Sequence, residues 1–93
     1  MKTIMLEVVV HNKDGLHVRP SMLIAEVASG FSSDIYLTCD GIRTPAKTGM
    51  EILLLRAVAG ATVVVEACGT DAEAAIQAMK EVIEREFDFP RQG

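Results

Sequence analysis

The 93-residue chain has few aromatic side chains: they make up 4% of it, and tryptophan is absent. A hydrophobic core must therefore be built from aliphatic side chains and methionine, and hydrophobic residues of all kinds reach 49% of the chain. A chain of this length supports one small core, whereas a deep active-site cavity is not expected. We predict a single domain over residues 1–93, with residues 87–93 forming a frayed tail.

The chain also lacks an excess of positive charge, because 9 Lys and Arg residues face 13 Asp and Glu residues and give a formal net charge of −4. Nucleic acids and anionic membranes attract positively charged surfaces, so neither is an expected partner. No apolar run approaches the roughly 18 residues that span a bilayer. Glu7 interrupts the apolar N-terminal stretch, and no small-residue cleavage site follows it. We expect a cytoplasmic protein without membrane insertion.

Cysteine is scarce as well, and Cys39 and Cys68 form no CxxC pair. In a reducing compartment both are expected to be small buried hydrophobic residues. Nothing in their spacing requires a disulfide, and that alternative stays open.

Hydrophobic periodicity predicts the order of secondary structure. Alternating apolar and polar residues predict four strands, at residues 2–10, 34–39, 42–45 and 61–67. Apolar stripes with helical spacing predict three helices, at about residues 20–30, 48–55 and 71–85. The resulting order βαββαβα, with one apolar face on each element, predicts an α+β fold of two layers. One face of a four-stranded antiparallel sheet is covered by the three helices, and the other is open.

Local signals mark the helix starts. Pro20 suits the first position of a helix, where its missing N–H has no partner to lose. Thr48 with Glu51, and Thr70 with Glu73, match the capping box, in which a threonine cap is followed three residues later by glutamate.

The stretch GLHVRP, residues 15–20, places an imidazole and a guanidinium at the predicted start of the first helix. Backbone N–H groups at such a start lack partners within the helix and favour an anion. Arg19 adds donors whose geometry matches phosphate oxygens, and Gly15 lets the loop approach closely. The grouping suits His17 as a nucleophile beside a phosphate site. A helix cap or a solvated loop residue would also explain a single histidine here.

Two other chemistries fit this loop poorly. His11, Asp14 and His17 share it, but their spacing matches no common metal-ligand pattern and Arg19 would repel a cation, so no metal is expected. A free-standing hydrolase is disfavoured because Asp14 is the only other acid or base near His17 in the sequence.

The GLHVRP motif resembles the active-site signature of the HPr family, the histidine-containing phosphocarrier proteins of the bacterial phosphoenolpyruvate:sugar phosphotransferase system. The resemblance covers nearly the whole chain, through Ser29-Gly30-Phe31, the Asp40-Gly41 turn, Ala46-Lys47-Thr48 and the acidic last helix. It implies an open-faced β-sandwich. It also implies a carrier with a covalent phosphohistidine intermediate, rather than a free-standing enzyme, that acts without a cofactor.

The resemblance also implies a role for each residue of the motif. His17 would accept a phosphoryl group from enzyme I and pass it to an enzyme IIA-type partner. Arg19 would stabilise the phosphoryl oxygens. Gly15, Val18 and Pro20 would form the phosphate cradle and the helix start.

Partner docking and regulation are implied next to this motif. The resemblance places docking at Met22, Lys47 and Met50, which would form a small apolar patch with one positive charge. Thr48 stands where many family members carry a regulatory serine phosphorylated by HPr kinase/phosphorylase, although its place in a capping box explains a hydroxyl equally well. We expect a monomer.

The chain departs from the family pattern in the charges around this patch. Glu26 and Glu51 stand where the familiar sugar pathway often has lysines, which favours a specialised enzyme I because rim charges select partners. An alternative is an HPr-like regulatory protein that binds a transcription factor or kinase depending on phosphorylation at His17 or Thr48.

Overall fold

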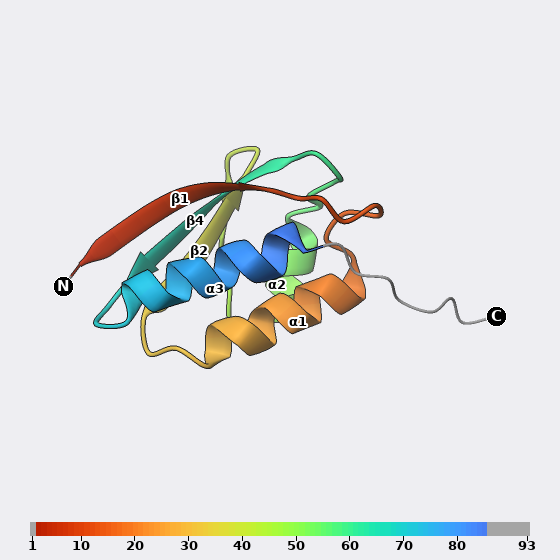
Figure 1. Ribbon diagram of the computed structural model, residues 1–93. Helices are drawn as coiled ribbons and strands as arrows, with labels where there is room; N and C mark the ends of the chain where they lie inside the picture. Colours follow the sequence, from red (N-terminus) through yellow and green to blue (C-terminus); the bar gives the residue numbers. More distant parts are fainter. Residues whose placement is uncertain (1, 86–93) are drawn as a thin grey trace.

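The computed structural model describes residues 2–85, and seven elements follow one another in the order βαββαβα (Figure 1). The predicted tail at residues 87–93 lies outside the described residues. The bounds of the elements are β1 Thr3–Val9, α1 Val18–Ser29, β2 Asp34–Cys39, β3 Ile42–Pro45, α2 Gly49–Leu54, β4 Thr62–Cys68 and α3 Ala72–Glu84.

The four strands form one sheet in the order β1-β4-β2-β3, and every neighbouring pair is antiparallel. The register explains why alternation in the sequence is so regular. One row of partners, Leu6, Val65, Leu37 and Thr44, crosses all four strands. Val65 and Leu37 in this row are completely buried.

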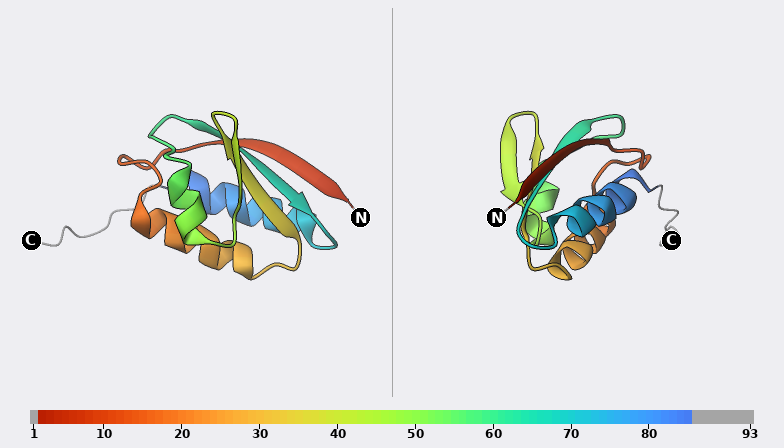
Figure 2. Two further views of the ribbon diagram at one scale, coloured as in Figure 1. Left: turned by 180° about the vertical axis from the view of Figure 1, so that it is seen from behind. Right: turned by 60° about the vertical axis from the view of Figure 1, so that its left-hand side comes forward.

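All three helices lie on one side of the sheet, and α1 packs against both α2 and α3 (Figures 1 and 2). The predicted two-layer fold is therefore confirmed. The core between the layers is aliphatic, as the shortage of aromatic residues requires, and burial of each such side chain contributes about 1.5–3 kcal/mol. Its largest fully buried hydrophobic side chains are Ile24, Leu37, Ile52, Met79, Ile83, Val8, Val10, Val63 and Val65.

The helix starts differ in detail from the sequence prediction. Helix α1 begins at Val18, so Pro20 is its third residue and not its first. The shift costs nothing, because the N–H of a third helical residue also lacks a partner within the helix. Neither capping box forms. Thr48 is the N-cap of α2 without a side-chain cap bond, and α3 is preceded by Asp71 where Thr70 was predicted.

Both cysteine thiols are free. Cys39 is buried as predicted, and burial, with a smaller contribution from Asp40, raises the pKa of its thiol. Cys68 is only half-buried, because it lies at the end of β4. Among residues 2–85, no helix has the length and apolar character needed to cross a bilayer.

Candidate functional site

His17 is the N-cap of α1. Its backbone is extended, with φ −81° and ψ −165°, and its side chain is half-buried. The backbone N–H of Ser21 donates to the carbonyl oxygen of His17 at 3.0 Å, which is the first hydrogen bond of the helix. Val18 and Arg19 follow as the first and second helical residues and are exposed. The first turn contains no acidic residue, so nothing in it opposes an anion at the helix start.

The loop that leads to His17 is fixed by buried hydrogen bonds. The Nδ2 of buried Asn12 donates to the Gly15 carbonyl oxygen at 3.0 Å, and the Gly15 N–H donates back to the Asn12 carbonyl oxygen at 2.9 Å. The Leu16 N–H donates to the Ala57 carbonyl oxygen at 2.9 Å. These bonds hold the segment before His17 against the segment that follows α2.

Gly15 has no substitute in this loop. Its φ is +71°, and an added Cβ would lie 2.4 Å from the Ala57 carbonyl oxygen and 2.9 Å from the Val58 Cα. The close approach therefore needs a residue without a side chain, both for its backbone conformation and for space.

Exposed apolar side chains lie on α1, on α2 and on the segment that follows α2. Val18 and Met22 on α1 are each 58% exposed, and the contacting helix α2 contributes two more residues of this kind, one turn apart. Val58 joins them through its contact with the Gly15 loop. We call this set the apolar surface; its members are Val18, Met22, Met50, Leu54 and Val58.

A shallow groove of about 460 Å³ runs between α1 and the start of α2. It is shaped by Gly49, since an added Cβ there would lie 2.6 Å from the Met22 Sδ. The predicted docking residues come together here: the groove is lined by Met22, Ala25, Glu26, Ser29, Lys47, Thr48, Gly49 and Met50.

The polar residues of this region differ in their surroundings. The Lys47 ammonium donates to the Phe31 carbonyl oxygen at 2.9 Å, while Thr48 is exposed. Glu26 is exposed at the groove, whereas Glu51 is half-buried and accepts a hydrogen bond of 3.3 Å from the Thr44 Oγ1. Only Glu26 of the two predicted acidic rim residues lines the groove.

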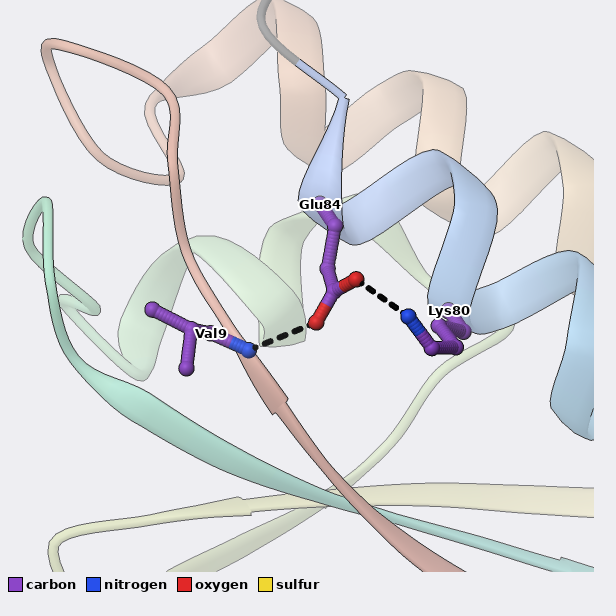
Figure 3. A network of polar contacts seen from close by, with 3 residues as sticks. All are labelled: Val9, Lys80 and Glu84. Carbon is purple, nitrogen blue, oxygen red and sulfur yellow. Dashed lines mark hydrogen bonds and ion pairs between the residues drawn. The ribbon is translucent and has the colours of Figure 1, made fainter.

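A polar network at the end of β1 holds the chain at the point where it enters the His17 loop (Figure 3). The Val9 N–H donates to the Glu84 Oε2 at 3.2 Å, and the Lys80 Nζ donates to the Glu84 Oε1 at 2.6 Å. The hydrogen bond from Lys80, followed by that from Val9, lowers the pKa of the Glu84 carboxyl. The network ties the C-terminal end of α3 to the point where the chain leaves β1 for the His17 loop.

Sequence reasoning missed two side chains that hold the His17 loop, Asn12 and Ser21. The Ser21 Oγ donates to the Leu16 carbonyl oxygen at 3.1 Å, and both side chains are almost fully buried. A signal for Ser21 was present, because it stands three residues before Ile24 on the buried stripe of the helix. Among the described residues, no group of three or more histidine, cysteine, aspartate or glutamate side chains is placed to hold a metal ion.

Comparison with known proteins connects this site to a family. The family model described as "PTS HPr component phosphorylation site" matches residues 4–85. The phosphocarrier protein HPr of Treponema pallidum (strain Nichols) is 35% identical over 77 residues, which are 83% of this chain and 88% of that protein.

Solved structures agree with the sequence match. The crystal structure of a phosphocarrier protein HPr from Bacillus anthracis str. Ames has a TM-score of 0.86 and 31% identity, covering 90% of this chain and 100% of that one. The solution structure of Crh, the Bacillus subtilis catabolite repression HPr, has a TM-score of 0.68 and 31% identity, with coverage of 90% and 100%. The chain therefore belongs to the HPr family, the phosphocarrier proteins of the phosphotransferase system.

Proposed function

We propose that His17 carries the phosphoryl group, receiving it from enzyme I and delivering it to an enzyme IIA-type partner. The observation that supports this most directly is the position of His17: a half-buried imidazole at the N-cap of a helix whose first turn has no acidic residue. In a chain of the HPr family, this is the histidine whose surroundings best suit a phosphoryl group.

The transfer moves one group between two imidazoles. The Nδ1 lone pair of neutral His17 attacks the phosphorus of the donor phosphohistidine, forming a new N–P bond. The donor's N–P bond breaks, and its electron pair stays on the donor nitrogen. Delivery to the next partner repeats the step with His17 as the donor. Because the reaction exchanges one N–P bond for another, it needs positioning and charge stabilisation more than an additional acid or base.

The neighbouring residues divide this work. The Arg19 guanidinium offers a fork of donors to the phosphoryl oxygens. Val18 and Arg19 bring backbone N–H groups of the first turn, and Gly15 allows the loop its close approach. Pro20 rigidifies the turn without removing a helix hydrogen bond, since its position needs none.

Docking to both partners uses the apolar surface and the adjoining groove. Exposed apolar area of this kind, which includes Met22 and Met50, is typical of contact surfaces. Lys47 adds a positive charge at the groove. We propose a cytoplasmic monomer, because a carrier must present the same face to two partners in turn.

The test is phosphoryl acceptance followed by intact-mass analysis. The protein is incubated with phosphoenolpyruvate and phosphorylated enzyme I, and a gain of one acid-labile phosphoryl group is expected. The variant His17→Ala should gain none, while His11→Ala, which removes the other histidine, should behave as wild type. Phosphoryl gain in His17→Ala at the wild-type level would overturn the assignment.

The charge of Glu26 leads to an expectation about the donor. Because Glu26 is exposed at the groove and Glu51 is engaged with Thr44, Glu26→Lys should raise the acceptance rate from a sugar-pathway enzyme I severalfold at low salt. Glu51→Lys should raise it less. A rate measured by rapid quench that is unchanged in Glu26→Lys would contradict a specialised donor.

A regulatory role is the second candidate, and one observation favours it. Thr48 is exposed and lines the groove, so phosphorylation there would place strong negative charge on the docking surface. HPr kinase/phosphorylase would be the modifying partner. A pull-down with unphosphorylated, His17-phosphorylated and Thr48-phosphorylated protein separates the two roles. Onward transfer to an enzyme IIA supports the carrier, while a transcription factor or kinase retained by one phosphorylated form, without transfer, supports the regulator.

A further inference from the structure

Ser21 makes an unusual pair of hydrogen bonds at the proposed site. Its Oγ donates to the Leu16 carbonyl oxygen at 3.1 Å, and its backbone N–H donates to the His17 carbonyl oxygen at 3.0 Å. One residue therefore holds the carbonyl groups on both sides of His17. The side chain is only 1% exposed, so the hydroxyl is directed by its partner and not by solvent.

Because a peptide group is planar, fixing these carbonyl groups also fixes the directions of the N–H groups that follow them. A trans peptide is planar, and its N–H points opposite to its C=O; the described residues contain no cis peptide bond. Because the Leu16 carbonyl is turned toward the buried Ser21 hydroxyl, the His17 N–H points away from it. The Val18 N–H is fixed in the same way by the bond from the Ser21 N–H. The Val18 N–H is thus held at the helix start, where the proposed function places the phosphoryl oxygens, and the backbone that carries the His17 imidazole is fixed on both sides.

The preceding peptide group is fixed by the same kind of contact. Asn12 donates from its buried Nδ2 to the Gly15 carbonyl oxygen at 3.0 Å, so the carbonyl groups of Gly15, Leu16 and His17 all have defined partners. A loop whose three consecutive peptide groups are hydrogen-bonded has little freedom to change its backbone conformation.

The bond from Ser21 is not the ordinary one for a helical serine. Serine hydroxyls inside helices commonly donate to a carbonyl three or four residues earlier. Ser29, in the last turn of the same helix, does this by donating to the Ala25 carbonyl oxygen at 2.8 Å. Ser21 reaches five residues back, past the helix start, to a loop carbonyl. A buried hydroxyl without a partner would cost folding free energy, and the hydrogen bond from Ser21 to the loop carbonyl avoids this cost.

We propose that Ser21 is a positioning residue for phosphoryl transfer, and that it fixes the backbone on both sides of His17, so that the imidazole and the Val18 N–H are oriented before the phosphoryl group arrives. This inference rests on the proposed function of His17. Donors that are oriented in advance stabilise developing charge without reorganisation during the reaction. Asn12 supports the same arrangement one peptide earlier.

The test compares Ser21→Ala with Ser33→Ala, which removes the hydroxyl bond of another buried serine, to the Asp71 carboxylate, outside the docking groove. Two readouts are used well below the unfolding temperature of each protein. The first is the rate of acceptance from phosphorylated enzyme I over a range of concentrations. The second is the backbone amide resonances of His17 and Val18 by ¹⁵N–¹H NMR.

Ser21→Ala should lower the saturated acceptance rate about tenfold and leave the half-saturating concentration unchanged, because the imidazole is held less firmly in its attacking position and is not removed. The His17 amide resonance should move, whereas that of Val18 should change little, since the backbone bond of residue 21 remains. Ser21→Cys, which keeps the shape with a weaker donor, should fall between the two and serves if the alanine variant does not fold. Ser33→Ala should change neither readout.

Two results would overturn the inference. One is an acceptance rate and a His17 amide resonance in Ser21→Ala that match wild type, and the other is equal changes in Ser33→Ala. A wild-type protein that accepts no phosphoryl group from active enzyme I would instead overturn the proposed function itself, so the two failures are distinguishable.

Discussion

Helices α1 and α3 lie side by side, but their N-terminal ends are built in opposite ways. Asp71 is the N-cap of α3, and Glu73 lies in its first turn, so that helix start carries its own negative charge. His17 is the N-cap of α1, whose first turn has no acidic residue. Because a helix N-terminus favours an anion, α3 meets this preference from within the protein, whereas the first turn of α1 supplies no anion of its own.

The α3 end is also closed by contacts to the rest of the chain. The Asp71 carboxylate accepts hydrogen bonds of 2.9 Å from the backbone N–H groups of Ser32 and Ser33, together with bonds from both hydroxyl groups. Glu73 pairs with Lys2. At the start of α1, by contrast, the buried polar side chains of Asn12 and Ser21 donate to backbone carbonyl oxygens, while His17 is half-buried and Arg19 is exposed. We propose that the missing acid is what leaves the α1 start open to a phosphoryl group.

Among these variants, Gly15→Ala is expected to cause the largest loss of stability at the start of α1. The new Cβ would lie 2.4 Å from the Ala57 carbonyl oxygen in a residue with φ +71°. Left-handed strain and overpacking together should lower the free energy of unfolding by about 3 kcal/mol, measured by urea denaturation. Gly41→Ala is the matched control: it has φ +80° but nothing within 4 Å, so only the strain of about 1 kcal/mol is expected. Equal losses in the two variants would show that the close approach of the loop is unimportant.

Val18→Glu would give α1 the acid that α3 already has. Val18 is exposed at the first helical position, so a glutamate there fits sterically and should stabilise the helix by about 0.3–1 kcal/mol. The same charge should repel the incoming phosphoryl group and slow acceptance about tenfold, which corresponds to about 1.4 kcal/mol. Val18→Gln controls for the loss of the apolar side chain. If the glutamate and glutamine variants accept phosphate at the same rate, the missing acid has no bearing on reactivity.

The order of elements could be predicted from the sequence because it depends on local periodicity. Each strand and helix buries one face, and the alternation or helical spacing of apolar residues records that face directly. The place of His17 at the start of a helix was predictable for the same reason, since the loop ends where the helical stripe begins.

The details that failed depend on contacts between distant segments. Both capping boxes were reasonable local predictions. However, the Glu51 carboxylate accepts a hydrogen bond from Thr44 and not from the backbone of its own helix start. Asp71 replaces Thr70 as the N-cap of α3, and its carboxylate binds the loop after α1. The roles of Asn12 and Ser21 depend on which carbonyls the folded loop presents to them, and Leu54 and Val58 join the apolar surface only through packing. Sequence patterns give the face that a residue occupies, and they do not give its partner.

Asp71→Asn tests the start of α3 and is expected to have the smallest effect on stability. The hydrogen bonds, that of the Ser33 hydroxyl first and that of the Ser32 N–H next, lower the pKa of Asp71 from 3.8 to about 2. A carboxyl whose pKa is lower in the folded protein stabilises the fold above its unfolded pKa and loses this contribution as the pH falls through the folded value. The Tm of wild type should therefore decline between about pH 4 and pH 2, and more steeply than that of Asp71→Asn, whose amide does not titrate. Glu73 and Glu84 also have lowered pKa values, but both proteins share them, so the difference between the two Tm curves isolates Asp71. Parallel curves would mean that the α3 start does not depend on its built-in charge, and the contrast with α1 would then rest on His17 alone.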